Sequence, residues 1–379
     1  MRILAIDIGT GTQDIVLFDS TVEPENCFKL IMPAPTQILA TRVRQATRER
    51  KPLLLTGSLM GGGPVGWAVE AHLAADLPVY AEPDAARTLN DDLDRVRALG
   101  IHVLQQGDDL PGGAVVLQLK DLDLAAITAA LASFGLEPRL DGLAVAVLDH
   151  GDAPPETSDR KFRFQHIQAT ASLAASRVGQ SPETGLLSFA YTPAEVPAYL
   201  TRMRAVASCA PPDVPLVLLD TGPAAALGAL QDPHVGQRQN LLLINVGNMH
   251  TLAAHIVNGQ LVGILEHHTH RLTSESLVTY LRRFAARKLT NDEVFVDHGH
   301  GCFLATTCPN PRSRPFVAVT GPRRRLLGAA FHSSDFAAGS PYFAVPHGDM
   351  MTTGCWGLVR AFAAKYPTWE PEIRKALGV

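Results

Sequence analysis

The stretch RILAIDIGTGTQDIVLFD, from Arg2 to Asp19, decides the fold. Its apolar residues 3–6 and 15–18 predict two short strands, joined by a turn rich in glycine and threonine. Glycines let backbone N–H groups turn toward an anion, threonine hydroxyls add donors, and the Asp7 carboxylate can hold Mg²⁺ directly or through water. An ordinary glycine-rich hairpin is the alternative interpretation. The favoured prediction is a phosphate and magnesium site formed by Asp7, Gly9, Thr10, Gly11, Thr12 and Gln13.

The same pattern returns in the second half of the chain as NVGNMHTLAAHIVNG, from Asn245 to Gly259. It follows the apolar run 241–244, places a polar residue shortly before a glycine, and leads into a second apolar strand. Two such hairpins predict a duplicated fold that holds phosphates between its halves. The nucleotide-binding residues expected from the second hairpin are Asn245, Gly247, Asn248, His250 and Thr251.

These hairpins resemble the superfamily of acetate and sugar kinases, heat-shock chaperone ATPases and actin, where they are called the phosphate 1 and phosphate 2 motifs. DTGPAAALGAL (220–230) is similar to the first connecting helix of that superfamily, FVAVTGPRRRLLGAAF (316–331) to its adenosine motif, and TTGCWGLVRAF (352–362) to its second connecting helix. The resemblance implies an α/β fold of two ribonuclease H-like, or actin-like ATPase, domains with a nucleotide cleft between them. We expect residues 1–212, with a Gly-rich insertion, to form the first domain and residues 213–379 the second, whose last helix returns toward the first.

The resemblance also implies roles for single residues. Asp220 follows an apolar strand and precedes a helix, where the superfamily presents a catalytic carboxylate that accepts a substrate proton or orients a water; the alternative is a helix N-cap. Thr320, Gly321 and Arg323 are expected beside the nucleotide, although a solvated basic turn also explains the arginine. Asn245 departs from the superfamily, which often has aspartate there, so metal binding is expected to rest on Asp7 and the phosphates.

Three further segments have no place in a minimal nucleotide hydrolase. TGSLMGGGPVGWAVEAHL (56–73) is a Gly-rich loop that leads into a helix but lacks the lysine of a P-loop, so it is expected to hold an anionic substrate. EHHTHRL (266–272) and DHGHGC (297–302) are rich in histidine, and alternate spacing in the second makes a zinc-type metal on His298, His300 and Cys302 the less favoured alternative. The predicted substrate-binding residues are Gly61, Gly62, Gly63, Glu266, His267, His298 and His300. The last four are predicted to converge in one pocket across from the ATP phosphates.

Composition sets the broad class. A length of 379 residues with 46% hydrophobic residues favours two domains, and a net charge of -4 gives no general attraction to nucleic acid or anionic membranes. No apolar run approaches the ~20 residues of a membrane span, and the start of the chain does not resemble a secretion signal. The five cysteines are scattered without a C-x-x-C pair, which is typical of reduced thiols. We therefore expect a cytoplasmic protein.

Alternating strands and helices are expected along the rest of the chain. Apolar runs bounded by Gly, Pro or Asp predict buried strands at 53–55, 115–119, 143–148, 216–219 and 316–319. Helical patterns lie at 36–48, 85–99, 124–134, 193–207, 274–289 and 354–365.

The segments GTGTQD, GGGP, YAEPDAARTLNDDL, GHGC and PHGDMMTTGC also resemble one branch of the superfamily, whose members are sometimes labelled "pyruvate formate-lyase activating enzyme-like". That label implies an iron–sulfur cluster on C-x-x-x-C-x-x-C, which the sequence lacks. The favoured function is an ATP- and Mg-dependent phosphotransferase acting on a small polar or anionic metabolite. The alternative is an ATP-hydrolysing activator of a protein partner or metallocofactor.

Overall fold

Two six-stranded sheets and one four-stranded sheet organise the chain. This architecture comes from a computed structural model, which describes residues 1–106, 108, 112–136, 139–175, 182–311, 313–328, 331 and 333–378. The first six-stranded sheet starts with an antiparallel meander whose first strand then pairs in parallel with a later strand. Its order is β3 (Phe28–Pro33), β2 (Thr12–Asp19), β1 (Arg2–Ile8), β8 (Gly142–Val147), β10 (Leu216–Leu219) and β9 (Ala190–Tyr191).

The second six-stranded sheet repeats this plan. Its hairpin strands are antiparallel, and the first of them again pairs in parallel with a later strand. The order is β14 (Gly301–Leu304), β13 (Gln260–His268), β12 (His250–Val257), β11 (Asn240–Val246), β15 (Phe316–Thr320) and β16 (Tyr342–Phe343). Both predicted hairpins are therefore confirmed, and their shared arrangement, a hairpin whose first strand pairs in parallel with a later strand, supports the predicted duplication. The orders differ at the edges, because the hairpin side has three antiparallel strands in the first sheet and four in the second. The expected boundary at 212/213 stays a prediction, and β10, which follows it, pairs with β8 of the first sheet.

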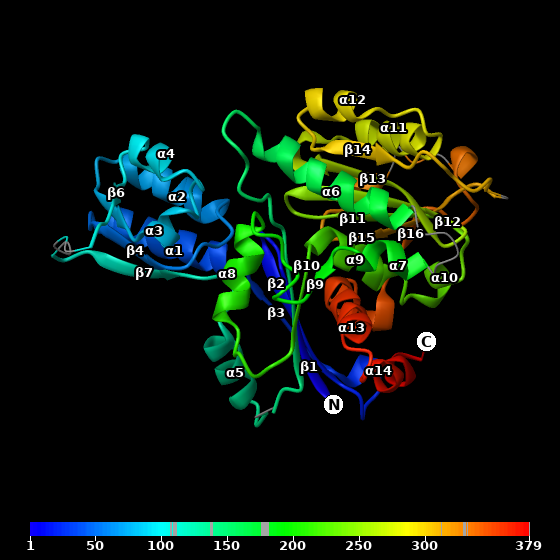
Figure 1. Ribbon diagram of the computed structural model, residues 1–379, viewed down its shortest axis with the longest axis horizontal. Coiled ribbons are helices and arrows are strands. Elements are labelled where there is room, and N and C mark those ends of the chain that lie inside the picture. Colours follow the sequence, from blue (N-terminus) through cyan, green and yellow to red (C-terminus); the bar gives the residue numbers. More distant parts are fainter. Residues whose placement is uncertain are drawn as a thin grey trace.

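The four-stranded sheet belongs to the insertion between β3 and β8. All its strands are parallel, and it has a hydrophobic core of its own. The insertion lies to one side of the molecule, in blue and cyan at the left of Figure 1. Its strands are β4 (Leu53–Gly57), β5 (Val79–Ala81), β6 (His102–Val103) and β7 (Val115–Leu119), and its helices are α1 (Pro35–Arg48), α2 (Pro64–Leu73), α3 (Pro83–Ala86) and α4 (Leu93–Ala98).

Two helices pack together beside the six-stranded sheets, α9 (Thr221–Ala229) and α13 (Thr353–Lys365). Glycine makes this close packing feasible, because a Cβ at Gly228 would overlap the carbonyl oxygen of Thr353, and one at Gly357 would overlap that of Ala224. Helix α13 is buried along most of its length and also contacts β1, β8 and β10. This long helix near the C-terminus thus lies against strands of the first sheet.

Two of the helices expected from the sequence have different bounds in the structure. The segment 85–99 splits into α3 and α4, because the Asp92 side chain accepts a hydrogen bond from Asp94 N and begins a new helix. The segment 193–207 becomes helical only at Thr201, because Pro197 lacks an N–H and clashes with the preceding turn of a helix. The remaining helices are α5 (Leu124–Ala132), α6 (Asp159–Ala175), α7 (Pro182–Leu187), α8 (Thr201–Cys209), α10 (Pro233–Gly236), α11 (Ser274–Ala285), α12 (Asn291–Val296) and α14 (Glu370–Leu377).

Within the described residues, no helix combines the length and apolarity that crossing a membrane requires.

Candidate functional site

A cavity of about 110 Å³ lies where the turns of the two hairpins meet. The turns approach so closely that a Cβ at Gly11 would overlap the side-chain amide of Asn248. The cavity therefore receives groups from both sheets, as the hairpin prediction requires. Its lining includes ten of the residues predicted from the phosphate and adenosine motifs: Asp7, Gly9, Thr10, Thr12, Asn245, Gly247, Asn248, His250, Thr320 and Gly321.

Two carboxylates face this cavity from adjacent strands. Asp7 on β1 pairs in register with Asp14 on β2. Burial raises the pKa of Asp7 well above its ordinary range, and the charges of Asp14 and Asp220 raise it further. Burial also raises the pKa of Asp14 to about 7, against a hydrogen bond from Thr12 and with help from Asp349.

Each of these two carboxylates has a buried oxygen, Oδ1, that accepts no hydrogen bond from the described residues. Buried oxygens without donors are costly, and carboxylates with free lone pairs are the ligands that Mg²⁺ uses in proteins. The pair therefore fits a divalent cation better than the single aspartate that we predicted. Asp14 belongs to the stretch 2–19 on which the prediction rests, but the sequence alone did not show that it lies opposite Asp7, because it immediately precedes an apolar run.

Some of the residues predicted to bind the nucleotide line the smaller cavity, and others do not. Gly321 has a φ of 93°, and a Cβ there would overlap the carbonyl oxygen of Val246, so both backbone and space require glycine. Gly11, Gln13, Thr251 and Arg323 do not line the cavity. The Gln13 amide donates to Pro33 O at 3.1 Å, the Thr251 hydroxyl lies 2.9 Å from that of Thr269, and Arg323 is exposed.

The basic turn is also different from the expected helix start. Residues Arg324–Leu327 form a 3₁₀ turn, so the arginines do not lie at the N-terminus of an α-helix. Residues 329–330 of the predicted adenosine motif lie outside the described residues.

A second cavity, of about 550 Å³, adjoins the first. Gly61, Gly62 and Gly63 line it at the start of α2, where we predicted a substrate loop. The loop is anchored by Asp121, which accepts a hydrogen bond from Gly61 N at 3.1 Å. Arg202 in turn donates to both Asp121 oxygens, at 2.7 and 2.9 Å. The residues that line both cavities are Gly9, Thr10, Leu148, Arg202, Met249 and His250.

Asp220 lines neither cavity. It caps α9 by accepting from Gly222 N at 3.1 Å, and both its oxygens accept from Arg163, at 2.6 and 3.1 Å. Arg163 also donates to both oxygens of Glu266, at 2.8 and 2.6 Å. The expected catalytic carboxylate is therefore a cap and an ion-pair partner in this structure. Nothing in the sequence singled out Arg163, because its role depends on where α6 packs.

The predicted histidine cluster forms only in part. His300 Nδ1 lies 3.8 Å from Glu266 Oε2, so these two residues do come together. His267 points to the other face of β13, because side chains alternate along a strand, and its Nε2 lies 3.4 Å from Asp297 Oδ2. His298 is exposed, with a φ of 64°. The convergence of His267 and His298 with the others was therefore wrong, and so was the proposed grouping of His298 with His300 and Cys302.

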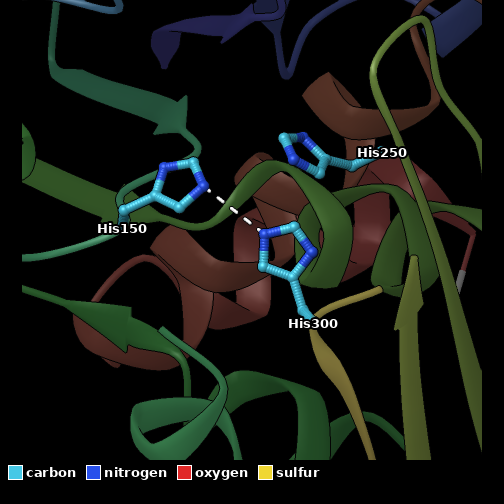
Figure 2. Close-up of side chains that lie close together, drawn as sticks. All are labelled: His150, His250 and His300. Atoms are coloured by element: carbon cyan, nitrogen blue, oxygen red, sulfur yellow. Dashed lines mark hydrogen bonds between the residues drawn. The ribbon is translucent and has the colours of Figure 1, made fainter. Parts of the chain in front are cut away.

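Instead, His300 meets histidines that were not predicted to join it. His150, which directly follows Asp149 after β8, and His250 at the start of β12 turn their rings toward it (Figure 2). The His268 ring centroid lies 4.6 Å from that of His300 and 5.0 Å from that of His250. Strand parity was the available signal, because it places Glu266 and His268 on one face of β13 and His267 on the other.

The two six-stranded sheets share the arrangement of a hairpin and a parallel neighbour, and the chain is therefore an α/β protein with a duplicated sheet plan. A family described as "Putative pyruvate format-lyase activating enzyme (DUF1786)" matches residues 60–326, and the chain belongs to this family. This agrees with the branch resemblance seen in the sequence. No curated protein matches the chain.

Several solved kinase structures show a weaker likeness. A protein from Listeria monocytogenes described as "a putative N-acetylmannosamine kinase" is 11% identical, with 96% of this chain and 99% of that chain covered and a TM-score of 0.33. The ROK hexokinase from Thermus thermophilus is 11% identical, with 69% and 47% covered and a TM-score of 0.23. A protein from Cytophaga hutchinsonii described as "a putative sugar kinase", also 11% identical, has 69% of this chain and 49% of that chain covered and a TM-score of 0.23. The chain thus spans about half of the last two proteins, and TM-scores this low carry no argument about function.

Proposed function

We propose that this protein is an ATP-dependent phosphotransferase that acts on a small polar or anionic metabolite. The observation that carries the proposal is the junction of two cavities. One is small and holds the unpartnered Asp7 and Asp14 oxygens, and the other has a volume of about 550 Å³. Cavities that bind small ligands commonly measure roughly 300–1,000 Å³.

In this proposal the smaller cavity holds phosphate groups and the larger one holds the acceptor. Asp7 and Asp14 would hold Mg²⁺, which would neutralise charge on the phosphates. The turns around Gly9 and Gly247 supply backbone N–H groups to the phosphates. A volume of about 110 Å³ suits phosphates rather than a whole nucleotide, so the nucleoside extends past Gly321.

The acceptor lies beside the loop at Gly61–Gly63, where the N-terminus of α2 favours an anionic group. Phosphoryl transfer depends mainly on positioning and on charge stabilisation, and less on a strong base. The reaction therefore does not need Asp220 as a proton acceptor. Asp220 serves as a positioning residue, because it holds Arg163 and through it Glu266, which lines the smaller cavity.

The test is ATP consumption with a panel of polar and anionic metabolites, compared with basal hydrolysis. We expect at least one acceptor to raise ADP formation above the basal rate in a Mg²⁺-dependent way, and Asp7→Asn to abolish the increase. Asp19→Asn, at the far end of β2, is the matched control and should retain it. If millimolar Mg-ATP gives neither a thermal shift nor any calorimetric heat, the proposal fails.

The description of the family favours one second candidate, an ATP-hydrolysing activator of a partner enzyme or metallocofactor. The absence of C-x-x-x-C-x-x-C from the sequence counts against iron–sulfur chemistry of the kind the description names. The same assay separates the two functions. An activator hydrolyses ATP without phosphorylating any metabolite, and a partner protein alters its rate.

A further inference from the structure

We propose that His150, His250 and His300 bind Zn²⁺, with an open coordination position toward the cavity of about 550 Å³. This site is separate from the Asp7–Asp14 pair. The binding of the metal does not depend on ATP, but its use in holding an acceptor rests on the proposed phosphotransferase function.

The geometry of the three rings supports a single shared ligand. One ring nitrogen from each histidine lies within 4.8 Å of the others. Zn–N bonds of about 2.0–2.1 Å in a tetrahedral site place nitrogens about 3.3 Å apart. The Nε2 atoms of His150 and His300 are already 3.4 Å apart, and Figure 2 shows both rings turned toward each other, with His250 facing them. Small side-chain rotations therefore bring the set to zinc geometry.

One of the three rings has a buried nitrogen that is free to bind an ion. Neutral imidazole is the form that coordinates a metal. The buried Nε2 of His250 has no hydrogen-bond partner among the described residues, and an ion would satisfy it.

A carboxylate behind the cluster strengthens the assignment. Metal-bound histidines commonly donate their second ring N–H to a carboxylate, which fixes the ring orientation. Glu266 Oε2 lies 3.8 Å from His300 Nδ1, on the side of the ring away from His150. Two hydrogen bonds from Arg163 fix Glu266, and Asp220 fixes Arg163. A separation of 3.8 Å is too long for a hydrogen bond, and His300 Nδ1 has no partner among the described residues, so in this proposal the network holds Glu266 where His300 would donate to it once the ring has moved onto the metal.

The lining of the large cavity indicates what the metal would do. His150 and His250 line this cavity together with Gly61–Gly63. Three protein ligands with a fourth position open are typical of zinc sites that bind a substrate or water. We therefore assign the acceptor to metabolites with an anionic oxygen that can coordinate zinc, such as a carboxylate or a deprotonated hydroxyl.

The test uses metal alone, without nucleotide. The purified full-length protein is stripped with a chelator, and Zn²⁺ binding is measured by calorimetry and elemental analysis. Co²⁺ then reports the ligand set by its visible absorption. We expect one Zn²⁺ per chain and a tetrahedral, nitrogen-rich Co²⁺ spectrum. His150→Gln and His300→Gln should weaken binding at least 100-fold, and Glu266→Gln by roughly 10–100-fold, the range for groups behind the ligands.

His267→Gln and His298→Gln are the matched controls, because they alter neighbouring histidines that point elsewhere, and both should bind as the wild type does. The Co²⁺ spectrum of the wild type needs no variant, so the test survives a misfolded mutant. An octahedral, oxygen-rich spectrum, or equal Zn²⁺ affinity in folded His300→Gln, would overturn the assignment. Zinc binding without ATP consumption would leave this inference standing and count against the phosphotransferase.

Discussion

Replacing Asp14 by asparagine removes a buried carboxyl group whose pKa is raised from 3.8 to about 7 by burial. The folded protein holds that proton more tightly than the unfolded chain does. Stability is therefore lost as the pH rises from about 4 to about 7, and the full cost remains above pH 7. A rise of about three pKa units corresponds to about 4 kcal/mol at pH 8, at roughly 1.4 kcal/mol per unit, and to about 2 kcal/mol at pH 5.

An uncharged asparagine at position 14 does not carry this cost. We expect Asp14→Asn to gain roughly 2–3 kcal/mol relative to wild type on going from pH 5 to pH 8. The assay is urea unfolding of both proteins at these two pH values without metal. At the same time the variant should lose its Mg-ATP-dependent stabilisation, because the carboxylate that raises the cost is the one proposed to bind Mg²⁺.

Asp19→Asn is the control, since it alters the same hairpin with the opposite sign. Burial raises the pKa of Asp19, but hydrogen bonds from Thr21 and Arg2 outweigh it and lower the pKa to about 2. That variant should lose stability above pH 4. If Asp14→Asn changes stability equally at pH 5 and pH 8, Asp14 does not carry a charge that burial disfavours, and the reasoning is refuted.

Three further predictions address the rest of the site and the packing beneath it. Asp7→Asn should abolish the Mg²⁺-dependent part of ATP binding in calorimetry, and an unchanged magnesium dependence would remove Asp7 from the metal site. Asp220→Asn leaves Arg163 short of a charge partner and should cost about 3–5 kcal/mol in urea unfolding, whereas unchanged stability would contradict its assignment as a buried ion-pair partner. Gly228→Ala should cost roughly 1–3 kcal/mol or more, because α13 leaves no room for a methyl group. Gly112→Ala, with no atom of the described residues within 4 Å of the added Cβ, should be near neutral, and equal effects of the two substitutions would contradict the packing account.

Much of the fold could be predicted because its signals are local. Residues 2–19 and 241–257 contain two apolar runs separated by a tight turn, and each run became a strand of one hairpin. The assignment of strands to sheets was not local. The runs 53–55 and 115–119 were expected as strands, but their separate sheet also uses β5 and β6, which are too short to show an apolar pattern.

The candidate site was predictable where it lies on a turn and unpredictable where it depends on packing. The turns at Gly9 and Gly247 carry their own glycine signal, and both line the smaller cavity. Arg163 could not be found, because a helix brings it to carboxylates 57 and 103 residues away in the sequence. His150 was missed for a similar reason, because a single histidine after a strand indicates a metal site only once the fold has brought it beside His250 and His300.

The two hairpins have the same strand arrangement but carry different side chains at equivalent positions. This difference predicts on which side of the smaller cavity a cation would bind. Asp7 lies opposite Asp14 in the first hairpin, whereas Asn245 lies opposite Leu252 in the second. In the proposed function, a cation between the hairpins would therefore be drawn to the first one, and the phosphates bound to it would lie on that side. Among the described residues of the second sheet, Met249 beside β12 and His250 at its start line both cavities. In the proposed function, an acceptor molecule in the larger cavity would therefore approach the phosphates beside His250, which lines both cavities. A zinc ion on the histidine cluster would bind an oxygen of that acceptor close to the phosphates.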